Sequence, residues 1–145
     1  MTRKALMLFA TVALMMVAAT AVAAAATPGV QAQSATFSKA HLEPVGGSGV
    51  HGTVLLFQLP SEGTQIVVFA KGLTPGKRYV SLYYDNDHCA LEPYSEDDVI
   101  GGPYTALPGG FGFTIGTADD DLDEIHSVSV RSAKNFQLRA CAKVG

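Results

Sequence analysis

The sequence predicts an all-β domain, a β-sandwich or flattened β-barrel of about seven to eight antiparallel strands. Three observations support this fold class. Beyond residue 33, short runs rich in Val, Leu, Phe and Tyr alternate with polar residues, as half-buried strands do. Turns that contain Gly and Pro separate these runs at a spacing typical of sandwiches and barrels. No window shows the periodicity of an amphipathic helix.

Turn and loop signals bound each expected strand. Residues 60–63 (Pro-Ser-Glu-Gly) are a hairpin signal, and residues 74–77 (Thr-Pro-Gly-Lys) form a β-turn with Pro at its second position. A long polar loop is expected at 86–103. The runs expected to form strands are 35–45, 51–59, 64–70, 78–85, 111–117, 125–131 and 136–144.

Residues 1–32 are expected to be a secretory signal peptide. A short basic stretch precedes an apolar stretch at 6–22, and small residues suit cleavage after Ala26 or Ala32. The alternative is an uncleaved anchor, since the apolar stretch could just span a bilayer; only then would the protein contact a membrane. The folded domain would occupy 33–145, in a secreted or periplasmic protein.

Charge and apolar content argue against two classes of protein. The chain of 145 residues has a formal charge of −3, and loss of Arg3 and Lys4 with the signal peptide makes the remainder more negative. Nucleic-acid binding needs a basic patch, so no nucleic acid is expected as a partner. No second long apolar run follows, which argues against a membrane protein with several spans.

Cys89 and Cys141 are the only two cysteines in the chain. In an oxidising compartment an even number of cysteines predicts disulfides, and two cysteines allow a single intramolecular pairing. A bridge of this span would stabilise a small domain by about 4 kcal/mol. The alternative is a pair of free thiols.

Three strings of residues, together with the order of the expected strands, are similar to those of one known family. Residues 49–54 (Gly-Val-His-Gly-Thr-Val) precede a hairpin, residues 71–77 (Lys-Gly-Leu-Thr-Pro-Gly-Lys) precede a strand, and residues 139–145 (Arg-Ala-Cys-Ala-Lys-Val-Gly) end the chain. They resemble the second strand, the turn before the copper-binding strand and the C-terminal strand of the Cu,Zn superoxide dismutase family. The resemblance covers most of the chain beyond the signal peptide. It implies that family's fold, a Greek-key β-sandwich or flattened β-barrel, with Cys89 and Cys141 at the positions of its disulfide.

One of these strings has a second interpretation. Residues 73–79 (Leu-Thr-Pro-Gly-Lys-Arg-Tyr) also resemble the Leu-x-Pro-Gly-x-x-Tyr turn of fibronectin type III domains. That turn comes late in its domain, whereas a long stretch of chain follows it here. Both resemblances imply a sandwich.

The metal ligands that the dismutase resemblance implies are replaced in this sequence. Two copper-binding histidines of the family match Ser81 and Tyr83. No histidine lies between Cys89 and Ile125, where the bridging and zinc-binding histidines would be. Arg131 stands at about the place of the last copper histidine. Imidazole nitrogen suits both metals, so neither copper nor zinc is expected as a cofactor.

We therefore expect an exported, non-catalytic β-sandwich that acts as a binding or structural protein, with an unknown protein or small ligand as its partner. In one hypothesis Ser81 and Tyr83 are exposed at the former metal site and line a recognition surface. The simpler interpretation of these side chains is packing across strands. The alternative function is a superoxide dismutase, or a copper- or zinc-binding protein, with relocated ligands.

The charge distribution agrees with a non-catalytic role. All of the 13 acidic residues except Glu43 and Glu62 lie in two segments, 85–98 and 119–124, which would repel the superoxide anion. The arginine that guides substrate in the family lies three residues before the second cysteine. Here the arginine is displaced by one residue, to Arg139, and such a shift turns a strand side chain to the other face.

Two segments could hold a metal ion at a place other than the family's metal site. Asp85, Asp87 and His88 are close in sequence and could supply a partial site, although a solvated charged loop is the simpler explanation. The run 119–124 (Asp-Asp-Asp-Leu-Asp-Glu) suggests a calcium site, but Glu124 occupies the position of the EF-hand glycine. A charged turn that keeps the domain soluble explains the run equally well.

Overall fold

The computed structural model describes residues 36–145, and the signal peptide expected at 1–32 lies outside the described residues. The described chain forms strands and one turn of 3-10 helix, η1 (Glu96–Asp98). The strands are β1 (Phe37–Pro44), β2 (His51–Gln58), β3 (Thr64–Lys71), β4 (Arg78–Tyr84), β5 (Tyr104–Thr105), β6 (Gly112–Ala118), β7 (Ser127–Ser132) and β8 (Leu138–Lys143). Between residues 36 and 145, no helix is long and apolar enough to cross a membrane.

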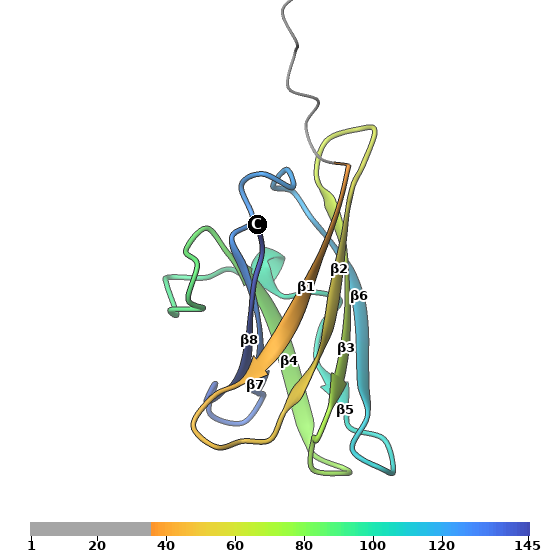
Figure 1. Ribbon diagram of the computed structural model, residues 1–145, viewed down its shortest axis with the longest axis vertical. Coiled ribbons are helices and arrows are strands. Elements are labelled where there is room, and N and C mark those ends of the chain that lie inside the picture. Colours follow the sequence, from red (N-terminus) through yellow and green to blue (C-terminus); the bar gives the residue numbers. More distant parts are fainter. Residues whose placement is uncertain (1–35) are drawn as a thin grey trace, which may run out of the picture. The chain divides into compact units, whose positions relative to one another are not determined.

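The strands form one antiparallel sheet in the order β5-β4-β7-β8-β1-β2-β3-β6, which curls into a nearly closed barrel (Figure 1). The two edge strands, β5 and β6, lie close together. The ring of Tyr104 packs so tightly against Gly112 that an added Cβ would lie 2.8 Å from the ring. β3 and β4 follow each other in the chain but lie in different halves of the sheet. This crossing is the Greek-key connection, and the predicted all-β fold is confirmed.

The barrel has an inner core and a smaller second cluster outside it. The inner core includes Val54, Leu56, Ile66, Val68, Val128 and Val130, all fully buried. Side chains alternate along β4: Tyr79 and Tyr83 join the inner core, whereas Val80, Leu82 and Tyr84 form the second cluster with Cys89. The chain between β4 and β5 therefore covers an apolar patch on the outside of the barrel.

The structure differs from the predicted elements in the second half of the chain. β5 was not expected, because two residues are too few to show an alternating pattern. β8 begins at Leu138 rather than at residue 136, because Phe136 has a φ of 55°, which strand residues do not adopt. β7 begins at Ser127 rather than at residue 125. The polar loop at 86–103 contains η1, whose first turn is capped by the Ser95 side chain.

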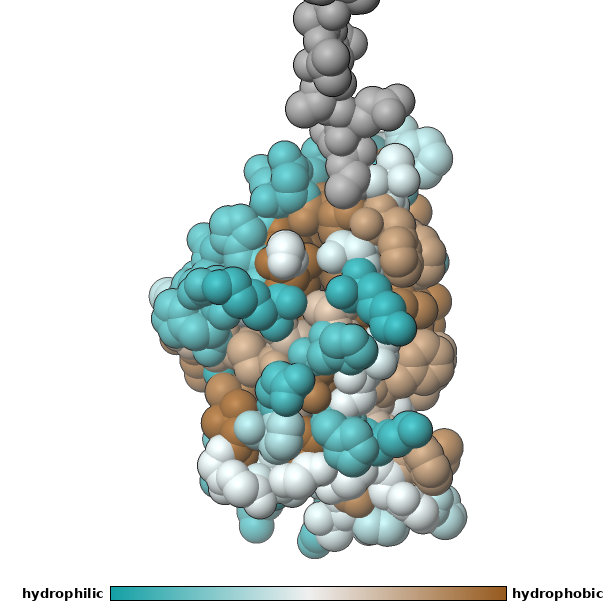
Figure 2. Space-filling view, in the orientation of Figure 1, coloured by the Kyte–Doolittle hydropathy of each residue, from teal (hydrophilic) through white to brown (hydrophobic). Residues whose placement is uncertain are grey.

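Large apolar side chains are exposed on the outer face of β1, β2, β3 and β6. Phe37 packs on Phe57, and Phe69 on Phe113, each pair with ring centroids 5.1 Å apart. Each pair is directly opposite across neighbouring strands. Figure 2 shows apolar residues along the right-hand side of the view, over β2, β3 and β6. These cross-strand pairs stabilise the sheet while solvent still reaches the rings.

Candidate functional site

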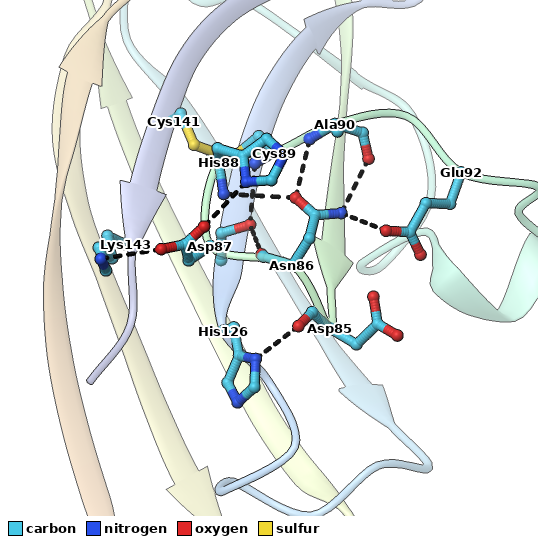
Figure 3. Close-up of polar contacts among 11 residues, drawn as sticks. Asp85, Asn86, Asp87, His88, Cys89, Ala90, Glu92, His126, Cys141 and Lys143 are labelled. Atoms are coloured by element: carbon cyan, nitrogen blue, oxygen red, sulfur yellow. Dashed lines mark hydrogen bonds and ion pairs between the residues drawn. A yellow bond between two sulfur atoms is a disulfide. The ribbon is translucent and has the colours of Figure 1, made fainter.

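A disulfide joins Cys89, in the loop after β4, to Cys141 in β8. The two Cα atoms are 6.0 Å apart, and the bridge links residues 52 positions apart in the chain. Cys89 is buried, and its N–H donates to the hydroxyl of Ser127, 3.1 Å away. The predicted pairing is confirmed, and the bridge fixes the loop to the outside of the barrel (Figure 3).

Asn86 shapes the turn that presents Cys89 to its partner. Its Oδ1 accepts from the N–H of Ala90 at 2.9 Å, and its Nδ2 donates to the Ala90 carbonyl at 3.0 Å and to Glu92 at 2.5 Å. The hydroxyl of Ser127 donates to the Asn86 carbonyl at 2.6 Å. The loop is thus fastened by side-chain hydrogen bonds on both sides of the disulfide (Figure 3).

Asp87 and His88 lie together, but Asp85 does not join them. The Asp87 carboxylate contacts His88 Nδ1 at 2.8 Å and Lys143 Nζ at 2.9 Å, and both ion-pair partners are exposed. Hydrogen bonds from His88 and then from Lys143 lower the pKa of Asp87 to about 2. The Asp85 side chain points away from this pair, while its carbonyl contacts His126 Nδ1 at 2.5 Å (Figure 3). Among residues 36–145, no three His, Cys, Asp or Glu side chains are grouped closely enough to hold a metal ion.

Arg131 is buried on β7, with 6% of its surface exposed, and each of its three guanidinium nitrogens donates a hydrogen bond. Its Nε donates to the Tyr84 hydroxyl at 2.9 Å, and its Nη1 donates to the Phe136 carbonyl at 2.7 Å. Its Nη2 donates to the Cys89 carbonyl at 2.6 Å. The Tyr84 hydroxyl also contacts the Ser129 hydroxyl at 2.8 Å, so the network continues along β7.

The two carbonyls that Arg131 binds belong to residues in a strained backbone conformation. Cys89 has a φ of 54° and Phe136 a φ of 55°, in the left-handed region that L-residues other than Gly rarely adopt. Such residues persist only where their surroundings hold them in place. Arg131 therefore stabilises two turns at once, the disulfide loop and the β7–β8 turn.

The two acidic segments noted in the sequence meet at the end of β4, around a pocket of about 170 Å³. Tyr83, Asp85, Glu92, Tyr94, Asp98 and Asp120 contribute to its lining. Burial, followed by the charge of Asp120, raises the pKa of Tyr83 to about 12. Burial, followed by the charge of Glu124, raises the pKa of Asp120. The pocket therefore has a negative potential.

Within the run 119–124, Asp121 makes hydrogen bonds to the β2–β3 hairpin. It accepts from the Gly63 N–H at 2.9 Å and from Gln58 Nε2 at 2.7 Å, and these two contacts lower its pKa. The Asp121 N–H donates to Glu124 at 3.0 Å. The run thus forms a turn that fastens the β2–β3 hairpin to the β6–β7 connection, in keeping with the charged-turn explanation.

The comparisons with known proteins concern the fold. No family model matches the chain, and no curated protein matches it. Among solved structures, a mutant form of superoxide dismutase 5 from Candida albicans is similar, with a TM-score of 0.53 and 15% sequence identity. The match covers 76% of this chain and 91% of that one. The fold is Cu,Zn superoxide dismutase-like. At this identity the likeness extends to the fold and not to the activity.

In this dismutase-like barrel, Ser81 and Tyr83 do not form an exposed surface, so that hypothesis is wrong. Ser81 is fully buried and Tyr83 is 7% exposed. The chain before β5 folds over them: the Ser81 carbonyl accepts from the Ile100 N–H at 2.8 Å, and its hydroxyl contacts that of Tyr104 at 3.1 Å. Of the two, only Tyr83 lines the acidic pocket.

Sequence reasoning did not find the residues that organise this region. Asn86 follows a strand directly and precedes Asp87, a position at which Asn commonly closes a turn through its side chain. That signal was present in the sequence. No local pattern marks Tyr84 or Phe136 as partners of Arg131, because these contacts depend on the pairing of β4 with β7 and on the β7–β8 turn.

Proposed function

We propose that the protein is an exported, non-catalytic member of the dismutase-like fold group, and that it acts as a binding or structural protein. The observation that carries this proposal is Arg131. The resemblance places the last copper histidine at about this position, and a guanidinium is a cation that cannot ligate another cation. Its N–H groups already bind Tyr84, Phe136 and Cys89.

The other two positions matched to copper ligands support the same proposal. The hydroxyl of Ser81 is paired with that of Tyr104 and lies in the packed interior. Burial raises the pKa of Tyr83 to about 12, which disfavours the phenolate that a metal would need as a ligand. The residues present thus do not fit the copper and zinc of the family, and no redox step is derived from them.

Export is supported by the disulfide, since such bridges persist in oxidising compartments and are rare in the cytosol. It is supported as well by the basic and apolar pattern of residues 1–32. The proposed location is therefore secreted or periplasmic.

Metal content tests the proposal. The full chain is expressed with export and disulfide formation, incubated with copper and zinc, dialysed, and measured for metal per chain by mass spectrometry. We expect near-zero metal and no superoxide dismutation. Stoichiometric copper with dismutase activity would overturn the proposal and would indicate relocated ligands, with His88 and Asp87 the first residues to substitute.

A further inference from the structure

A second hollow lies at the other end of β4 from the acidic pocket. It has a volume of about 400 Å³ and lies between the turn that leads into β4 and the β7–β8 turn, with one residue from β8. Figure 1 shows these two turns together at the lower end of the barrel. The volume falls within the range of sites that take small molecules, about 300 to 1,000 Å³.

The charged residues that line this hollow are all basic. They are Lys77, Arg78, Lys134 and Arg139. The whole chain has only 10 basic residues and a net charge of −3, so this is a strong local concentration of positive charge. Lys77 and Lys134 are far apart in the sequence, and the pairing of β4 with β7 brings their turns together.

Main-chain hydrogen bonds hold the two turns in place. The Lys77 N–H donates to the Thr74 carbonyl at 3.1 Å, and the Ala133 N–H donates to the Arg78 carbonyl at 3.0 Å. The Ser132 N–H donates to the Gln137 carbonyl at 3.0 Å. The frame of the hollow is therefore fixed without using the charged ends of its side chains.

The charged groups of these four basic side chains make few hydrogen bonds or ion pairs within residues 36–145. The side chains of Lys77, Arg78 and Lys134 take part in none of the hydrogen bonds or ion pairs of this part of the chain, where both ion pairs involve Asp87. Arg139 only reaches the Gln137 side chain, at 3.3 Å. Cations gathered without a counter-charge repel one another, and a bound anion relieves that repulsion.

We propose that this basic hollow binds a small molecule that carries a phosphate or sulfate group. Arg78 and Arg139 offer forked donors that match the oxygens of such groups, and Lys77 and Lys134 add mobile charges. Ser132 and Thr74 line the same hollow and can bond to hydroxyls on the rest of the ligand. The inference specifies the ligand class of the proposed binding role and rests on it.

The test is a calorimetric titration of the full, exported chain at constant ionic strength. The probes are inorganic phosphate, sulfate and glucose 6-phosphate, with glucose as the uncharged control. We expect saturable binding of the anions and none of glucose. Tighter binding of glucose 6-phosphate than of phosphate would assign the site to an organic ester; equal binding would assign it to the free anion.

Matched variants separate the hollow from the overall charge. Arg78→Gln and Lys134→Gln should each weaken binding about tenfold, because each removes a charge-assisted contact. Lys39→Gln makes the same charge change at an exposed residue of β1, outside the hollow, and should leave binding unchanged. Circular dichroism and melting temperature show that each variant is folded.

Two results would overturn the inference: no saturation with any of the anions, or equal weakening of binding by Lys39→Gln. Neither of these results bears on the non-catalytic role, which the metal measurement tests separately. Stoichiometric copper with dismutase activity, in turn, would overturn the non-catalytic role whatever the titration gives.

Discussion

The two ends of the barrel use their charged side chains in different ways. At the acidic end, carboxylates accept hydrogen bonds from the protein itself: Asp87 from Lys143, and Asp121 from Gln58 and the Gly63 main chain. At the basic end, main-chain hydrogen bonds close the turns, and the lysine and arginine side chains stand around an open hollow. The comparison teaches that carboxylates such as Asp87 and Asp121 are committed to structure at one end, whereas the basic side chains at the other end are available to a ligand.

The disulfide gives the largest expected difference between the ends. Cys89→Ser should lower the free energy of unfolding by about 4 kcal/mol, because the bridge no longer restricts the unfolded chain. Chemical denaturation of the variant, beside the wild-type protein with and without reductant, measures the change. The reduced wild type should resemble the variant. An unchanged free energy of unfolding would mean that the acidic end does not depend on its cross-link.

The next largest difference is expected between substitutions of two arginines, one at each end of the barrel. Arg131→Met should destabilise by about 3 kcal/mol, because the buried carbonyl of Cys89 and the part-buried carbonyl of Phe136 lose their donor. Arg139→Met removes the same charge at the basic end and should change stability by less than about 0.5 kcal/mol. Denaturation curves for both variants measure the contrast. Equal losses would show that the two ends are not as different as their contacts indicate.

The smallest expected effect is the pH dependence of the Asp87 contacts. Because His88 and Lys143 hold its pKa at about 2, below the ordinary 3.8, the charged form stabilises the folded state above about pH 4. That contribution is lost as the pH falls towards 2. Asp87→Asn should therefore lower the melting temperature slightly at pH 6, and less at pH 2.5.

Asp123→Asn is the matched control for Asp87→Asn, since Asp123 is an exposed carboxylate of the 119–124 run. It should show no comparable loss at pH 6. If Asp123→Asn lowers the melting temperature as much as Asp87→Asn, the effect comes from net charge and not from the contacts of Asp87.

The sequence predicts the fold where local pattern and local structure coincide. β2 and β3 alternate inward and outward side chains across a short turn, so their pairing follows from residues close in the chain. The Cys89–Cys141 bridge is predictable because only one pairing exists. β5 and the start of β8 are not predictable, since tertiary contacts and the positive φ of Phe136 decide them.

The candidate sites are less predictable because they are assembled from distant segments. Asp98 and Asp120 appear as two separate acidic runs, and only the folded chain places them around one pocket. Lys77 and Lys134 likewise share a hollow only because their turns lie at the same end of the barrel. Ser81 is a polar residue on a strand whose inner face is covered by residues from another part of the chain, so its burial could not be predicted from its neighbours.

The disulfide also decides what becomes of the molecule when its chain is cut. The loop after Cys89 is a natural place for a protease, because Leu91 and Tyr94 are 47% and 43% exposed. A cut there falls inside the covalent ring that Cys89 and Cys141 close, so both pieces stay joined. Strands on either side of the cut remain paired across the sheet. The protein can thus be cut once in this loop without coming apart.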